Sequence, residues 1–124
     1  MKPPLFDYAT PESVEEAVAA RAGEEDSVFL AGGQSLIPTL NFRIANPVLL
    51  IDIGHIPALK EIDVSDTEIT IGSMVRQRQV EKDEAVHRAN PLIREVLGNV
   101  AHAVVRNRGT IAGSIAHADA AAEL

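Results

Sequence analysis

The chain has 124 residues, a length typical of a single domain. Hydrophobic residues make up 46% of it, and the low aromatic fraction of 3% means that its core must be mainly aliphatic. The formal net charge is −7 and no basic run occurs. Nucleic acid and anionic membranes are therefore not expected as partners, because both are bound through clustered Lys and Arg.

The chain contains no cysteine, so it can form neither disulfides nor thiolate-bound metal or iron–sulfur sites. Its first residues lack the apolar core of a secretion signal. No segment approaches the roughly 18 apolar residues of a membrane-spanning helix. From these features we expect a soluble, cytoplasmic protein without a membrane span.

The first elements in chain order are a strand and a helix. Residues 6–8 predict a short edge strand. A helix should follow, with Thr10 as its cap, Pro11 at its first position and Ser13 as an alternative cap. Gly23 is expected to end this helix.

The next stretch predicts a strand, a glycine turn and a second helix. Residues 27–31 are an apolar strand that runs into Gly32 and Gly33, and helical spacing resumes at Leu36. This order directs backbone N–H groups toward whatever lies at the start of the helix. Residues 48–53 are almost entirely apolar, which is typical of a strand buried on both faces of a parallel sheet.

A subdomain boundary is expected at Ile56-Pro57, which divides the chain into residues 1–56 and 57–124. Beyond it, residues 59–64 and 68–71 predict a β-hairpin. A charged, solvated helix is expected over residues 76–83. The whole pattern predicts a mixed α+β fold.

Three more helices are expected toward the C-terminus. Asn90-Pro91 should start one of them, with its apolar face formed by Leu92, Ile93, Val96 and Leu97. Residues 100–105 predict the next. Residues 118–124 look like the opening of an alanine-rich helix with Asp119 as its N-cap, too short to be stable alone, so we expect the chain to be a fragment.

Two segments of small and hydroxyl residues are candidates for binding a diphosphate. The first, residues 31–36, could wrap phosphates with backbone N–H groups, or could simply be a tight turn in which Ser35 caps the next helix. The second, residues 110–114, offers two hydroxyls and the intervening amides; the alternative is a glycine-bearing loop packed under a helix. Together the two segments suit a dinucleotide whose two phosphates are bound by loops from both sides.

Other candidate sites are weaker. His117, Asp119 and Glu123 could suggest a metal, but His117 and Asp119 do not share a face in a helix or a strand, so no metal site is expected. A carboxylate bonding to ribityl or ribose hydroxyls fits better. No catalytic residue is expected, because nothing marks a nucleophile elbow.

The remaining His and Arg side chains have simpler interpretations. We place His102 on a helix face and both His55 and His87 in loops. Arg76 and Arg78 are expected at a solvated helix start rather than in a ligand site.

Several segments resemble the FAD-binding medium subunit of molybdenum hydroxylases, the family of carbon monoxide dehydrogenase, xanthine dehydrogenase and related N-heterocycle dehydrogenases. The resemblance runs from end to end with its motifs in order, and the segments that carry it are residues 2–8, 29–36, 50–53, 71–75 and 106–119. It implies an FAD-binding domain of two small α/β subdomains, the second with an antiparallel sheet, and with the cofactor between them.

The resemblance also assigns residues and partners. It implies that FAD is held by Ala31, Gly32, Gly33, Gln34, Ser35, Leu36, Thr110, Ile111, Ala112, Gly113 and Ser114, with Asp119 and Glu123 near its other polar groups. The implied partners are a molybdopterin-binding large subunit and an iron–sulfur small subunit. Electrons would pass from the iron–sulfur clusters through FAD to an external acceptor, making the chain part of a dehydrogenase.

The sequence departs from the family pattern in three ways. Ala112 replaces the usual first glycine of a Gly-Gly pair, which we expect to weaken FAD binding by crowding the phosphate. Ala120 replaces the usual proline after Asp119. Family members are also more than twice as long. The alternatives are a fragment of a free-standing FAD-dependent oxidase or reductase of the same fold, and a non-catalytic assembly fragment.

Overall fold

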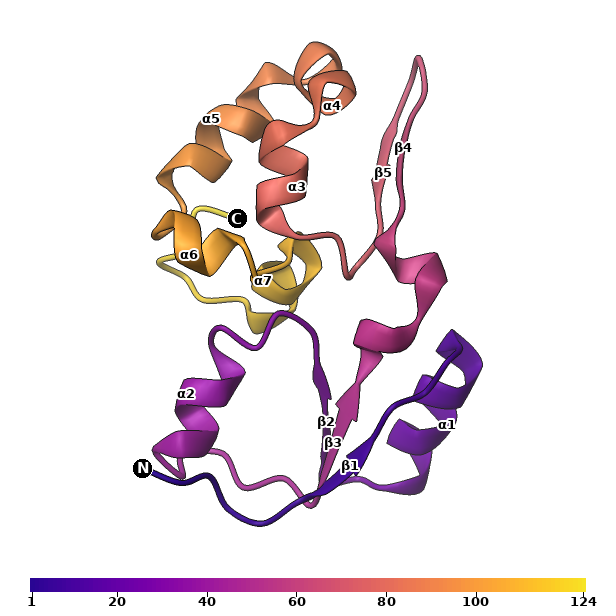
Figure 1. Cartoon of the computed structure of the whole chain (residues 1–124), viewed down its shortest axis with the longest axis vertical. Helices are drawn as coiled ribbons and strands as arrows, with labels where there is room; N and C mark the ends of the chain where they lie inside the picture. Colours follow the sequence, from indigo (N-terminus) through magenta and orange to yellow (C-terminus); the bar gives the residue numbers. More distant parts are fainter. The chain divides into compact units, whose positions relative to one another are not determined.

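The computed structural model describes all 124 residues and divides them into two compact units, Met1–Ala58 and Leu59–Leu124 (Figure 1). The first unit contains a parallel sheet and the second an antiparallel one. The expected mixed α+β fold is therefore confirmed. No helix in the structure combines the length and the apolar character that a bilayer crossing requires.

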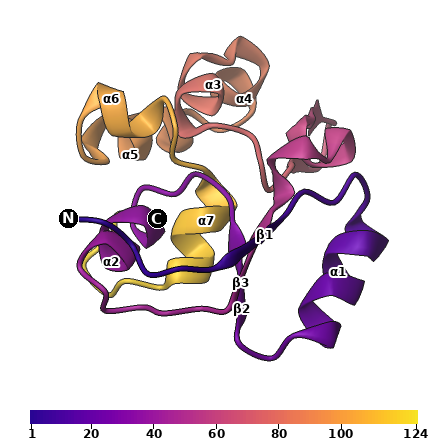
Figure 2. The same ribbon diagram turned by 60° about the horizontal axis from the view of Figure 1, so that its bottom comes forward.

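The first unit is built on a three-stranded parallel sheet in the order β1-β3-β2, formed by β1 (Asp7–Ala9), β2 (Ser27–Leu30) and β3 (Leu49–Asp52). The helices α1 (Val14–Gly23) and α2 (Leu36–Asn41) connect the strands and lie on opposite sides of the sheet (Figures 1 and 2). Leu50 and Ile51 point to opposite faces of β3 and are 2% and 0% exposed. The expected strand buried on both faces is confirmed.

Helix α1 starts later than expected. It begins at Val14, with the Ser13 hydroxyl accepting the Glu16 backbone N–H at 3.1 Å. The expectation that Pro11 occupies the first helical position was wrong. Ser13 takes the cap because Glu16 stands three residues after it, the spacing of a capping box, and the Glu16 carboxylate accepts the Glu12 N–H at 2.9 Å.

The second unit begins with a hairpin of β4 (Ile62–Val64) and β5 (Ile69–Ile71). The Ser65 hydroxyl holds its turn by accepting the Glu68 backbone N–H at 3.1 Å. The expected hairpin is confirmed, although residues 59 and 60 belong to a 3-10 helix, η2 (Pro57–Lys60), rather than to a strand. The backbone carbonyl of Leu59 accepts the Met74 N–H at 2.7 Å instead of pairing in the sheet.

Five short helices follow: α3 (Gln77–Lys82), α4 (Glu84–Ala89), α5 (Pro91–Asn99), α6 (Ala103–Arg106) and α7 (Ile111–His117). Helix α3 is present as expected, but it is not simply solvated, since Gln77 and Val80 are buried. Helix α5 starts where Asn90-Pro91 predicts, yet Leu92 is 61% exposed rather than on the apolar face.

Helix α6 begins three residues later than the expected start at Val100. Ala101 has a left-handed backbone with φ of 41°, and the carbonyls of Val100 and Ala101 bond to the Arg106 side chain instead of to a helix. His102 therefore stands at the N-cap position of α6 rather than on a helix face.

Two histidines expected in loops lie in helices. His87 belongs to α4, which the sequence pattern missed and which Asp83 caps by accepting the N–H groups of Ala85 and Val86. His55 ends a 3-10 helix, η1 (Ile53–His55), that Asp52 caps by accepting the Gly54 N–H at 2.8 Å.

The helix expected over residues 118–124 was wrong. Helix α7 forms earlier and ends at Ala118, whose backbone is left-handed with φ of 52°. Asp119 caps only a single turn, in which its side chain accepts the Ala121 N–H at 2.9 Å. Thr110 starts the helix instead, and Ile111 packs against the core, which outweighs the cost of about 1 kcal/mol for Gly113 within the helix.

The core of the second unit is aliphatic. Its buried cluster receives one face of the hairpin and consists of Val75, Val80, Val86, Leu97 and Val100, with Ile62, Val64, Ile69 and Ile71 packed against it. Ile111, in the first turn of α7, also packs against this cluster, so the start of α7 is supported by the core of the second unit.

Candidate functional site

The glycine turn of the first unit connects β2 to α2 and depends on Gly33. This residue has φ of 71°, a left-handed backbone that L-residues rarely adopt. A Cβ at this position would lie 3.1 Å from both Leu30 Cδ1 and Ile37 Cγ1. Glycine is thus required here both by conformation and by space.

This turn leaves backbone donors open. The N–H groups of Gly33, Gln34 and Ser35 donate to no acceptor in the structure, and Gln34 and Ser35 are exposed. Ser35 stands at the N-cap position, but its backbone is helical (φ −96°, ψ −42°) and its hydroxyl makes no capping bond. The alternative interpretation, a tight turn with Ser35 as the cap of the next helix, is confirmed for the position of Ser35 but without a side-chain bond. Consecutive open N–H groups can bind an anion.

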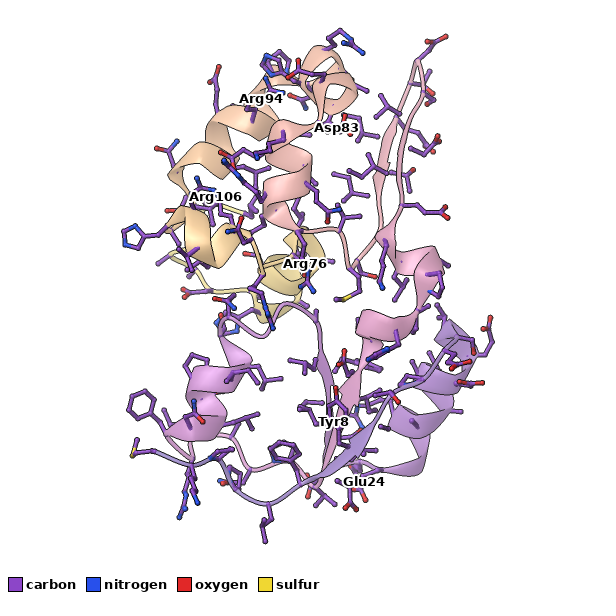
Figure 3. The ribbon with its side chains drawn as sticks, in the orientation of Figure 1. Tyr8, Glu24, Arg76, Asp83, Arg94 and Arg106 are labelled. Atoms are coloured by element: carbon purple, nitrogen blue, oxygen red, sulfur yellow. The ribbon has the colours of Figure 1, made fainter.

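Asp52 lies beside this turn, at the carboxyl end of β3, where it stands opposite Leu30 in the sheet register. Its carboxylate accepts the Tyr8 hydroxyl from β1 (Figure 3). This hydrogen bond raises the pKa of Tyr8, and burial and the negative charge of Asp52 act in the same direction. The edge formed by the carboxyl ends of parallel strands is where ligands bind in open α/β sheets.

The second predicted segment, residues 110–114, is the start of α7 and not a loop under a helix. Thr110 is the N-cap, 2% exposed, and its hydroxyl oxygen accepts the Gly113 N–H at 3.0 Å. Its carbonyl accepts the Ser114 N–H at 3.1 Å. The Thr110 hydroxyl and the Gly113 amide are thus engaged with each other, while Ile111, Ala112, Gly113 and Ser114 are all half-buried.

The two acidic candidates come after α7 in the chain. Asp119 and Glu123 are exposed and follow the far end of α7. A helix of this length separates its ends by about 10 Å, at 1.5 Å per residue. No group of three or more His, Cys, Asp or Glu side chains is placed to hold a metal ion.

An ion pair that the sequence pattern did not reveal supports the second unit. Arg106, 8% exposed, donates from Nε to Glu81 Oε2 at 3.0 Å and from Nη1 to the Val100 carbonyl at 2.8 Å (Figure 3). The Arg78 side chain, 2.9 Å from Glu81 Oε2, is the main cause that lowers the pKa of Glu81, and Arg106 adds to it. Arg78 is therefore an ion-pair partner of Glu81, although its side chain remains 35% exposed.

Arg76 stands at the start of α3, as expected, and also bonds to a distant part of the chain. Its guanidinium Nη1 donates to the backbone carbonyl of Arg108, just before α7 (Figure 3). No sequence signal pairs these residues, since they are far apart in the chain and the acceptor is a backbone atom.

Comparisons with known proteins bear on both segments. Residues 4–124 match the family described as "FAD binding domain in molybdopterin dehydrogenase". The chain is 48% identical over 125 residues to the 6-hydroxypseudooxynicotine dehydrogenase complex subunit alpha of Paenarthrobacter nicotinovorans, covering all of this chain and 42% of the relative. It is 43% identical over 119 residues to the carbon monoxide dehydrogenase medium chain of Hydrogenophaga pseudoflava, covering 94% of this chain and 41% of that one.

Solved structures give the same result. Quinoline 2-oxidoreductase from Pseudomonas putida 86 matches with a TM-score of 0.94 and 42% identity, over 97% of this chain and 42% of that one. Carbon monoxide dehydrogenase from Hydrogenophaga pseudoflava, in a form lacking the Mo-pyranopterin moiety, matches with a TM-score of 0.93 and 42% identity, over 96% of this chain and 42% of that one. The chain thus spans less than half the length of these relatives.

Proposed function

Because the chain belongs to the family of FAD-binding domains in molybdopterin dehydrogenases, whose cofactor is FAD, we propose that it acts within an electron-transferring medium subunit. That subunit would work in a heteromeric molybdenum hydroxylase. FAD, when bound, supplies redox chemistry that can link one-electron and two-electron carriers.

The observation that carries this proposal is the set of open backbone donors at the glycine turn. The N–H groups of Gly33, Gln34 and Ser35 offer hydrogen bonds to phosphate oxygens without any lysine, which suits a chain of net charge −7. Ala31, Gly32 and Leu36 complete the segment on either side. The small residues leave the backbone accessible, so this segment fits a diphosphate.

The start of α7 is the proposed second phosphate-binding segment. Thr110 stands at the N-cap of this turn, and its hydroxyl oxygen accepts the Gly113 N–H while its own O–H stays available as a donor to phosphate. Ile111, Ala112, Gly113 and Ser114 form the first helical turn, which is the part proposed to face the cofactor.

The acidic candidates take a separate role. Asp119 and Glu123 are the proposed partners of ribityl or ribose hydroxyls. Both side chains are exposed, so their carboxylates are accessible to hydroxyl donors of a ligand.

The proposed partners are a molybdopterin-binding large subunit, where substrate is oxidised, and an iron–sulfur small subunit. The names of the relatives, such as "medium chain" and "complex subunit", describe parts of assemblies and support this arrangement. The chain has no cysteine, which agrees with a division of labour in which it holds flavin and no cluster. Electrons would leave through FAD to an external acceptor.

Flavin-fluorescence quenching on titration of the chain with FAD tests the proposal. We expect FAD to bind more tightly than riboflavin, which lacks the diphosphate. The variant Gly33→Ala should weaken binding, because it strains the backbone and crowds Leu30 and Ile37. Gly23→Ala is the matched control, since a Cβ there meets nothing within 4 Å. Equal affinity for FAD and riboflavin, or no FAD binding, would contradict the proposal.

A further inference from the structure

The start of α7 is tied to the start of α3 by hydrogen bonds between residues distant in sequence. Arg76 Nη1 donates to the Arg108 carbonyl, and the Gln77 N–H donates to the Gly109 carbonyl at 2.8 Å. Arg76 and Thr110 also form an isolated antiparallel β-bridge. The carbonyls of two successive residues before α7 are therefore both bound by the start of α3.

Gly109 is also tightly surrounded by neighbouring atoms. A Cβ on Gly109 would lie 2.8 Å from the Gln77 Oε1 atom and 3.2 Å from the Val105 carbonyl oxygen. Gln77 is 4% exposed, and its Oε1 atom is buried without a hydrogen-bond partner. The buried Gln77 carboxamide thus fills the space beside Gly109 and leaves no room for the Gly109 backbone to move toward Gln77.

These contacts set the direction of the first turn of α7. Residue 110 follows directly on the held peptides, and its side chain and carbonyl fix the N–H groups of Gly113 and Ser114. The side chain of Arg76 starts from the N-cap position of α3, where the Arg76 N–H donates to Gln79 Oε1 at 2.8 Å. Arg76 is therefore held at its backbone by Gln79 and at its guanidinium by the Arg108 carbonyl.

From this geometry we propose that Arg76 is a positioning residue for FAD binding. It acts through the Arg108 carbonyl, and with the Gln77 backbone it orients the turn of residues 110–114. The inference rests on the proposed function, because that turn is the proposed second phosphate-binding segment. Arg76 itself needs no contact with the cofactor.

The test compares Arg76→Met and Arg76→Lys with the control Arg88→Met, because Arg88 is exposed on α4. For Arg76→Met we expect the FAD dissociation constant to rise about tenfold, the scale of one charge-assisted hydrogen bond. The Gly113 amide should also exchange its hydrogen faster, while the unfolding temperature stays near that of the wild type. Arg76→Lys keeps one donor and should restore part of both effects.

The outcomes separate this inference from the proposed function. Unchanged Gly113 exchange and unchanged FAD affinity in Arg76→Met would overturn the positioning role. If the wild-type chain binds no FAD, the proposed function fails, and Gly113 exchange alone decides whether Arg76 orients the turn. If Arg76→Met does not fold, Arg76→Lys takes its place: it should speed Gly113 exchange relative to the wild type, and unchanged exchange would overturn the proposal.

Discussion

Arg106 and Glu81 face each other in a two-point contact, with Nε to Oε2 at 3.0 Å and Nη2 to Oε1 at 3.4 Å. The side chains are 10% and 14% exposed, so the pair is largely shielded from water. The same guanidinium donates to the carbonyls of Val100 and Ala101, which accept no hydrogen bond within a helix. One side chain thus joins α3 to the segment that leads into α6.

We expect Arg106→Met to lower the free energy of unfolding by about 3 kcal/mol, because it leaves a shielded carboxylate short of a partner and two carbonyls unbonded. Urea denaturation would measure the loss. Arg88→Met is the control, since the exposed Arg88 side chain makes no ion pair in the structure. An equal, small loss in both variants would contradict the structural role of Arg106.

From the ion pairs of Glu81 with Arg78 and Arg106 we expect the stability of the fold to depend on pH. The pKa of Glu81 is lowered from its ordinary value of 4.5, mainly by the Arg78 side chain and then by Arg106. A carboxyl with a lowered pKa stabilises the fold above pH 4.5, and this contribution is lost as the pH falls from 4.5 through the lowered value.

Glu81→Gln should therefore flatten the acid side of the stability curve below pH 4.5, where the wild type loses this contribution. The comparison is with Glu84→Gln. Arg94 lowers the pKa of Glu84 as well, but Glu84 is exposed and its ion pair is screened by solvent. Identical acid profiles of the two variants would show that Glu81 has no special role.

Gly72 cannot be replaced without moving backbone. A Cβ there would lie 2.4 Å from the Leu59 carbonyl oxygen, which accepts the Met74 N–H at 2.7 Å. We expect Gly72→Ala to destabilise the chain by about 3 kcal/mol through this overlap. Gly98→Ala is the control, because a Cβ on Gly98 meets nothing within 4 Å and alanine favours the helix. Thermal unfolding of both variants should shift in opposite directions.

Tyr8 is the only tyrosine in the chain, so its ionisation can be followed by ultraviolet absorbance without interference. Its pKa should lie above the ordinary value of 10.0, because its hydroxyl is bonded to Asp52. Asp52→Asn removes the negative charge and should bring the midpoint back toward that value. Asp63→Asn, on the exposed face of β4, is the control and should leave the midpoint unchanged. A wild-type midpoint at or below 10.0 would contradict the Tyr8–Asp52 bond.

Ala112→Gly should separate cofactor affinity from stability. The substitution removes the methyl group expected to crowd the phosphate, so FAD should bind more tightly in a fluorescence titration. Ala112 lies in the first turn of α7, and glycine there should lower the unfolding free energy by up to about 1 kcal/mol. Unchanged or weaker FAD binding by a variant that remains folded would count against crowding at this position.

Local patterns in the sequence predicted the sheet well. The apolar run that contains Leu50 and Ile51 identified the central strand, since burial on both faces removes any polar alternation. Asn90 before Pro91 identified the start of α5 through cap and ring geometry. Each of these signals is carried by residues that are adjacent in the chain.

The misplaced helices near the C-terminus have a different origin. Both Thr110 and Asp119 are good caps, but Thr110 is buried and is followed by Ile111, which packs against the core, whereas Asp119 is exposed. The pairing of Arg106 with Glu81 and the bond from Arg76 to the Arg108 carbonyl depend on how α3 and the start of α7 meet. Side-chain spacing along the chain contains no information on such contacts.

The register of the parallel sheet has a consequence for how the chain folds. Asp7 of β1 and Ser27 of β2 both stand opposite the same residue, Leu49 of the central strand. Neither outer strand can form its ladder before β3 has been synthesised, so β1 waits for its partner while α1, β2 and α2 are made. Assembly of the first unit therefore depends on pairing between segments distant in sequence, which favours slow folding and prolonged exposure of unpaired strand edges.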